Sequence, residues 1–219
     1  MRCSILRKDY FKQIDTREKA YWLGFIWADG CISSDYKNII LDLVDGEHVV
    51  KFCNAIESDN KLYIHGNKGQ YTRVSVGCKE MALQINDYGC TPRKSLTIEY
   101  PNTNIFLGDF EKDFVRGYFD GNGCLCFSST MQKRSDLNSS KLYKREHWLF
   151  SIVGTKSMMN GIKNFLPVDT AIKQISSNGI SRIKCGGNQK IKIIMKSFYD
   201  NATIYLNRKY NKYLDLMKY

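Results

Sequence analysis

The chain has 219 residues and a formal net charge of +11, and 43% of its residues are hydrophobic while 25% are charged. This balance excludes a disordered chain and fits a folded protein with one ordinary core or two small packed halves. So large a positive charge favours a polyanionic partner, nucleic acid before an anionic membrane, although a basic protein without a nucleic-acid role remains an alternative.

The first predicted helix begins near Asp15, which can cap it, while Glu18 can reach back to the cap. The stretch from Ala20 to Ala28 is nearly all apolar, which predicts a helix buried on most sides. Gly30 ends this helix as a candidate left-handed C-cap. The following pattern predicts strands at 31–33 and 38–44, a helix at 45–56 capped by Asp45, strands at 62–65 and 71–76, and a helix at 79–88.

The same order of elements is predicted a second time. The elements are a helix at 110–120 ended by Gly121-Asn122-Gly123, strands at 124–128 and 148–153, a helix at 155–165, strands at 171–175 and 180–185, and helices at 189–199 and 203–217. Residues repeat as well, since 21–30 is similar to 114–123 and 71–77 is similar to 180–186. We therefore predict an α+β fold of two pseudo-symmetric αββαββα halves with antiparallel sheets, at residues 1–108 and 109–219.

The second copy carries a polar and basic insertion at residues 128–147. Its charged residues are Lys133, Arg134, Lys141, Lys144 and Arg145 against Asp136 and Glu146. Two interpretations of the insertion are equally supported. It is a solvated hairpin loop, or it is an arm that contacts DNA through residues such as Lys133 and Arg134.

Other classes of protein are disfavoured by what the sequence lacks. No apolar run is long enough to cross a bilayer, and the first residues lack a signal-peptide core, so we expect an intracellular protein. Its eight cysteines are then expected to be reduced thiols. The scattered histidines His48, His65 and His147 and the absence of a CxxC pair argue against structural zinc and against histidine-metal nucleases.

The two repeated helix stretches resemble the paired motifs of the LAGLIDADG homing endonucleases, of the two-motif, single-chain type encoded by phages and introns. In this sequence the motifs are Trp22-Leu-Gly-Phe-Ile-Trp-Ala-Asp-Gly30 and Val115-Arg-Gly-Tyr-Phe-Asp-Gly-Asn-Gly123, and the flanking stretches 88–95 and 202–210 share the family's character. The resemblance covers nearly the whole chain. It implies two sheets that form a saddle on double-stranded DNA, and a magnesium-dependent, site-specific endonuclease that propagates an intron or a free-standing element.

Small residues recur one turn apart on each motif helix. They are Gly24 and Ala28 on the first helix, and Gly117 and Gly121 on the second. This spacing lets two helix backbones approach closely, so the helices can form the seam between the halves. The C-terminal ends of the helices then meet, and their partial negative charge favours a bound cation.

The resemblance implies that Asp29 holds magnesium against the scissile phosphate, with the Ala28 carbonyl as a second ligand. An Asp at a helix C-terminus opposes the helix dipole, which makes a purely structural role unattractive. In the second motif Asn122 and Gly121 take these positions, and Asn122 brings an oxygen without charge. Asp120, two residues earlier, is more suited to a local hydrogen bond than to ligation. Weakened cleavage of both strands, nicking of one strand and binding without cleavage all remain open.

Further residues are candidates by their position on the predicted strands and helices. A basic or polar group near the metal would orient water and stabilise the phosphate, and the candidates that follow the fourth strand of each half are Lys79, Gln189 and Lys190. The alternative is that these are ordinary solvated residues at helix starts. Strand alternation suggests DNA contacts for Arg73, Arg182 and Lys184, and Lys190 is a further candidate.

The main alternative function is a binding protein on the same fold, either a maturase-like binder of intron RNA or a degenerate DNA binder. Asp29 favours the endonuclease, and Asn122 favours the binding protein. An intein endonuclease is disfavoured because the chain begins with Met and lacks the His-Asn ending that splicing needs. Because the chain carries both halves, we expect a monomer.

Overall fold

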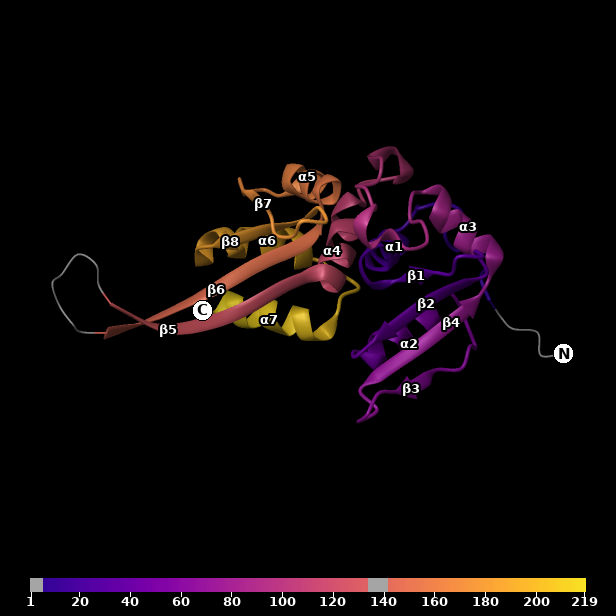
Figure 1. Ribbon diagram of the computed structural model, residues 1–219, viewed down its shortest axis with the longest axis horizontal. Coiled ribbons are helices and arrows are strands. Elements are labelled where there is room, and N and C mark those ends of the chain that lie inside the picture. Colours follow the sequence, from indigo (N-terminus) through magenta and orange to yellow (C-terminus); the bar gives the residue numbers. More distant parts are fainter. Residues whose placement is uncertain (1–5, 134–141) are drawn as a thin grey trace.

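A computed structural model of the protein describes residues 6–133 and 142–219 (Figure 1). The elements of the first half are α1 Arg17–Asp29, β1 Cys31–Ile32, β2 Asn38–Leu43, α2 Gly46–Ala55, β3 Tyr63–His65, β4 Tyr71–Gly77 and α3 Lys79–Asp87. The connection contains the short 3-10 helices η1 Lys94–Leu96 and η2 Thr103–Ile105. The second half contains α4 Glu111–Asn122, β5 Gly123–Lys133, β6 Leu142–Thr155, α5 Lys156–Phe165, β7 Ile172–Gln174, β8 Ile180–Gly186, α6 Asn188–Tyr199 and α7 Asn207–Lys218. The predicted α+β fold with two αββαββα halves is confirmed.

Each half builds a four-stranded antiparallel sheet with the same strand order, β1-β2-β4-β3 in the first half and β5-β6-β8-β7 in the second. Alternation along the strands separates a core face from an open face. On β4, Val74 and Val76 are buried, whereas Arg73 between Tyr71 and Ser75 lies on the open face. Helices α2 and α3 cover the core face of the first sheet, and α5 and α6 cover that of the second.

The two motif helices α1 and α4 pack against each other at the centre of the molecule (Figure 1). A Cβ atom on Gly24 would lie 2.0 Å from the carbonyl oxygen of Phe114, and one on Gly117 would lie 2.0 Å from that of Tyr21. A Cβ atom on Gly121 would lie 2.3 Å from the Cβ of Ala28. The structure thus brings the four small residues into one seam, where any larger side chain would push the helices apart.

A buried carboxylate fastens the seam on one side. Asp120 of α4 accepts hydrogen bonds from the hydroxyls of Tyr21 at 2.8 Å and Tyr199 at 2.5 Å, and from the backbone N–H of Leu206 at 2.8 Å. The Tyr21 hydroxyl also lies 2.9 Å from Nε2 of His48. Because Tyr21 gives its proton to Asp120, the imidazole of His48 donates from Nε2 to the Tyr21 oxygen. Asp120 therefore links both halves and has no oxygen free for a metal.

The termini of the first motif helix differ from the prediction. Thr16, not Asp15, is the N-cap, since its hydroxyl accepts from the N–H of Lys19 at 3.2 Å, while Asp15 forms an ion pair with the Lys19 side chain. Gly30 is extended, with φ −78° and ψ 160°, and is not a left-handed cap. The chain passes directly into β1, so an extended residue is required, and a Cβ there would lie 2.7 Å from the Ile26 side chain. The second motif helix continues to Asn122, two residues past its predicted end.

Residues 128–133 and 142–147 of the insertion belong to strands β5 and β6, and the solvated loop was one of its two interpretations. The two strands pair from Gly123 opposite Ile152 to Lys133 opposite Leu142. The predicted strands at 124–128 and 148–153 are therefore too short. Arg134 lies outside the described residues, as does the side chain of Lys133.

The close approach of α1 and α4 predicts that one methyl group added at the seam destabilises the protein strongly. Gly24→Ala places a Cβ against backbone that cannot move independently, so we expect the free energy of unfolding to fall by about 1–3 kcal/mol or more. Gly186→Ala is the control, because a Cβ there meets nothing within 4 Å, and we expect a change below about 0.5 kcal/mol. Urea titrations of both variants measure the two values. Equal destabilisation by the two variants would contradict direct backbone contact at Gly24.

The neutral state of His48 predicts a pH dependence. Burial, with repulsion from Lys51 and Arg208, lowers the pKa of His48 from its usual 6.5 to about 3. The stabilisation by neutral His48 is therefore complete above about pH 6.5 and is lost as the pH falls toward 3. We expect the stability advantage of the wild type over His48→Gln to shrink below pH 6.5 by up to about 1.4 kcal/mol per pH unit. Urea titrations across this range measure it, and a constant difference would refute the assignment.

Candidate functional site

The C-terminal ends of α1 and α4 open into a cavity of about 310 Å³. Its walls come from both halves and comprise Trp27, Ala28, Asp29, Lys94, Ser95, Ile98, Tyr118, Asn122, Val153, Gly154 and Ile180. The site therefore depends on the seam, since neither motif helix forms it alone. The sequence-predicted residues Ala28, Asp29 and Asn122 are brought together here, and Gly121 lies next to Ala28 in the seam.

Asp29 is the last residue of α1, and its side chain remains open to solvent. Burial of its surroundings raises the pKa of the Asp29 carboxyl, and the positive charges of Lys209, Lys94 and Arg208 oppose this rise. Within the described part of the chain, Asp29 forms no ion pair, although two buried lysines lie near enough to affect its ionisation. A carboxylate placed at the negative end of a helix and left without a direct partner is suited to receive a cation.

Two buried lysines cap the two motif helices at equivalent positions. The ammonium group of Lys94 donates to the carbonyl of Gly30, the residue that follows α1. The ammonium group of Lys209 donates to the carbonyls of Phe119, Asp120 and Gly123, each at 2.6 Å. Each lysine therefore satisfies carbonyls that a helix end leaves free.

The two lysines differ in the number of N–H donors that remain free. An ammonium group has three donors, and Lys209 uses all three on backbone carbonyls. Burial lowers the pKa of Lys209 to about 8. Lys94 uses one donor among the described residues and lines the cavity beside Asp29. Lys94 can therefore contact an anion in the cavity, whereas Lys209 is committed to holding α4 in place.

The sequence analysis did not select Lys94 or Lys209. A signal for them is present, because each follows an arginine in the flanking stretches 88–95 and 202–210, giving the pairs Arg93-Lys94 and Arg208-Lys209. The predicted candidates Lys79, Gln189 and Lys190, which follow the fourth strand of each half, are exposed in the first turns of α3 and α6 and do not line the cavity.

The second motif ends in an amide held inside the cavity. Asn122 is the last residue of α4, and its side chain hydrogen-bonds with the Tyr118 hydroxyl. That hydroxyl donates to the carbonyl of Val153 at 3.1 Å. Burial raises the pKa of Tyr118 to about 12, against the opposing effect of the bond with Asn122. The α4 end of the cavity therefore contributes neutral polar groups, and the α1 end contributes the carboxylate.

The open faces of the two sheets differ in charge. Arg73 on the first sheet pairs with Asp42 at 2.7 Å, and His65 lies 2.7 Å from the other oxygen of the same carboxylate. Burial raises the pKa of Asp42, but the hydrogen bonds from His65 and Arg73 outweigh it and hold this pKa below its usual value. On the second sheet, Arg182 and Lys184 occupy alternate positions of β8 on the open face, and Lys173 lies opposite Arg182.

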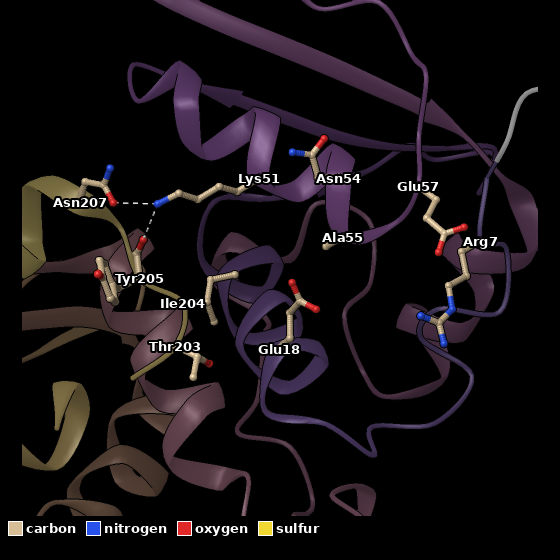
Figure 2. A pocket seen from close by; sticks show the side chains of 10 residues that line it. All are labelled: Arg7, Glu18, Lys51, Asn54, Ala55, Glu57, Thr203, Ile204, Tyr205 and Asn207. Carbon is tan, nitrogen blue, oxygen red and sulfur yellow. Dashed lines mark hydrogen bonds between the residues drawn. The ribbon is translucent and has the colours of Figure 1, made fainter. Parts of the chain in front are cut away.

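A larger hollow of about 590 Å³ lies on another part of the molecule, between α2 and the segment before α7 (Figure 2). Lys51 crosses it to reach the Asn207 side chain at 2.7 Å and the Tyr205 carbonyl at 3.4 Å. Its walls also carry Glu18 and Glu57, so its charge is mixed. The hollow shares no residue with the cavity at Asp29. In the hollow, Lys51 links the two halves through its hydrogen bonds.

The described residues contain no group of three or more His, Cys, Asp and Glu side chains arranged to hold a metal ion. They also contain no helix long and apolar enough to cross a membrane. The seven cysteines among them are free thiols. A cation in the cavity would therefore depend on one carboxylate, on neutral oxygens and on its substrate.

The sequence matches no family model and no curated protein, but solved structures match nearly the whole chain. The LAGLIDADG meganuclease I-CpaMI bound to uncleaved DNA has a TM-score of 0.63 at 14% identity, over 91% of this chain and 89% of that one. Meganuclease I-SmaMI bound to uncleavable DNA has 0.62 at 14%, over 91% and 87%. The I-LtrWI LAGLIDADG homing endonuclease bound to target DNA has 0.61 at 12%, over 96% and 91%. At these identities the likeness concerns architecture, and the chain has the fold of the LAGLIDADG homing endonucleases.

Proposed function

We propose that the protein is a site-specific DNA endonuclease that hydrolyses a phosphodiester bond in one strand at the α1 end of the cavity. The observation that carries this proposal is the pairing of Asp29 with Lys94, which has donors to spare, while the equivalent positions hold Asn122 and the committed Lys209. One end has both an anionic ligand and an available cation, and the other has neither. We further propose that it acts as an intracellular monomer at the insertion site of a mobile intron or free-standing element.

The groups in the cavity fit a hard divalent cation such as magnesium. Asp29 supplies an anionic oxygen, the end of α1 supplies the Ala28 carbonyl, and Asn122 supplies a neutral oxygen from the other half. Magnesium keeps several waters and binds through one or two carboxylates together with substrate phosphates, so it does not require a larger acidic cluster than the described residues provide. The chemistry that a bound magnesium ion supplies is polarisation of the phosphate and activation of a water molecule.

The chain's own residues would position the reaction. Asp29 would hold the metal ion through its carboxylate, and the positive charges of Lys209 and Lys94 keep the pKa of this carboxyl from rising further. Lys94 lines the cavity and keeps donors beyond its bond to Gly30, so it can offset charge that develops on the phosphate oxygens. In hydrolysis the water oxygen bonds to phosphorus, the phosphorus–oxygen bond to the sugar breaks, and the departing oxygen gains a proton.

The open faces of the sheets support DNA as the substrate. The second sheet presents Lys173, Arg182 and Lys184 around a hollow of about 600 Å³. These side chains can reach phosphates or base edges. The relatives named above were solved bound to DNA, which supports DNA as the partner. Binding without cleavage is the second candidate function, and the neutral Asn122 is the observation that favours it.

We predict that the two motif ends differ in cleavage. A supercoiled plasmid pool carrying random inserts is incubated with protein and magnesium, and relaxed and linear products are sequenced. The wild type should give relaxed plasmids that share a sequence, because only the Asp29 end is complete. Asp29→Asn should give neither product, since it removes the carboxylate, and Asn122→Asp should add linear product, since it supplies one at the second end.

Retention of the same sequence by Asp29→Asn on an affinity support controls for loss of binding. Linear product from the wild type would show that Asn122 suffices for the second strand. Specific binding without any product, for the wild type and for Asn122→Asp, would replace the nuclease with a binding protein.

Three lysine variants separate the roles assigned by geometry from those expected by sequence position. Lys94→Met should slow nicking by about 100-fold, because it removes a donor that faces the phosphate. Lys209→Met should mainly lower the free energy of unfolding, by about 1–3 kcal/mol or more, because it leaves buried carbonyls without donors. Lys79→Met should leave the nicking rate and the free energy of unfolding nearly unchanged. Single-turnover rates and urea titrations measure these effects, and a loss of rate in Lys79→Met alone would restore the sequence-based choice.

A further inference from the structure

Two cysteines lie side by side on strand β5. Cys124 and Cys126 flank Leu125, whose side chain is buried in the core. Because side chains alternate along a strand, both thiols lie on the opposite face, where Cys124 is exposed and Cys126 is partly exposed. Neither thiol lines the cavity at Asp29. The proposed endonuclease mechanism therefore leaves both thiols unused.

The spacing of the two thiols suits a metal ion better than a disulfide. Burial raises the pKa of Cys126, and the neighbouring thiol of Cys124 raises it further. Two residues along a strand span about 6.6 Å, at about 3.3 Å per residue. A disulfide needs Cβ atoms about 3.8 Å apart, which parallel side chains on one strand do not provide. A metal ion between the sulfurs is compatible with the spacing, since two metal–sulfur bonds of about 2.3 Å span about 4.6 Å.

The number of donors selects the kind of metal. Thiolates are soft ligands that prefer monovalent copper, zinc and iron–sulfur clusters. Zinc in structural sites takes four ligands. The described residues contain no group of three or more His, Cys, Asp and Glu side chains arranged to hold a metal ion. Monovalent copper is the soft ion that two thiolates in a line can satisfy, so two donors favour copper over zinc.

The charges around the thiols suit such a complex. Binding of monovalent copper releases two thiol protons to solvent, so the two-thiolate complex carries one negative charge. Lys212 on α7 and Lys184 on β8 lie near enough for their positive charges to act on Cys126 against the effect of burial. The sheet register also places Lys184 opposite Ser151, which lies opposite Cys124. These lysines would offset the charge of the complex.

The first half offers a natural comparison. By the repeat, Cys31 on β1 is the equivalent of Cys124, and it is also exposed. Ser33 stands two residues later, at the position of Cys126. Cys90 lies near Cys31 but is fully buried. Within the described part of the chain, a pair of accessible thiols on one strand face therefore occurs at β5 alone.

We propose that Cys124 and Cys126 form a two-thiolate binding site for monovalent copper, on the strand that follows the second motif helix. The ion is held by two sulfurs from one strand, without a third protein ligand. This inference does not depend on the proposed endonuclease function, since its donors are separate from the groups of the cavity.

The test transfers monovalent copper to the protein from its coloured complex with bicinchoninate, without oxygen, and the loss of colour measures binding. The wild type should take up one tightly bound ion per chain. Cys124→Ser and Cys126→Ser should each weaken this binding by about 100-fold, because a single sulfur remains and the chelate is lost. Cys31→Ser is the matched control and should bind as the wild type does, since it removes an exposed thiol that has no accessible partner. Urea titrations check that all three variants are folded.

X-ray absorption at the copper edge identifies the ligands directly, and two sulfur neighbours are expected. Three or more sulfurs, or nitrogen and oxygen neighbours, would overturn the inference. Equal affinities of the wild type and the two β5 variants, or a loss of binding in Cys31→Ser, would overturn it as well. Zinc that binds as tightly as copper at the same thiols would overturn the choice of metal. Each of these outcomes is independent of whether the protein cleaves DNA.

Discussion

Direct backbone contact between α1 and α4 is the constraint on which the rest of the molecule depends. Gly24 and Gly117 each leave space for a carbonyl oxygen of the other helix, so the two helices run closer than side chains would allow. This closeness sets the distance between the halves. It also makes the helix ends meet in one cavity, and this is why the carboxylate of one half and the amide of the other share a site.

The convergence of the two helix C-termini concentrates negative charge, and two lysines offset it. Two helix C-termini point at one place, so their unpaired carbonyls concentrate negative charge in the cavity. Lys94 and Lys209 cap these carbonyls from outside the helices. The unequal number of carbonyls bound by each lysine matches the unequal acidity of the two motifs, so the asymmetry extends over several side chains of the site.

The sequence was sufficient for the architecture because the signals were local and occurred twice. Periodicity, the two motifs and the repeated strand order identified both halves, and the spacing of small residues on each motif helix identified Gly24, Ala28, Gly117 and Gly121 as the seam. The sequence did not predict the features that depend on tertiary packing. The extension of β5 and β6 was hidden in a polar stretch without strand-like alternation, and Lys94 reaches Gly30 across 64 residues, so its role appears only after folding. Thr16 replaced Asp15 as the cap because Lys19 competes for the carboxylate.

The hydrogen bond from Tyr21 to Asp120 also affects which halves associate. By the repeat, Phe114 stands in the second motif where Tyr21 stands in the first, and Trp27 stands where Asp120 stands. Two copies of the second half would face Asp120 with a phenyl ring, so this buried carboxylate would lose one of its three donors, at a cost of about 1–3 kcal/mol. The seam therefore favours the pairing of two unlike halves over the pairing of two second halves.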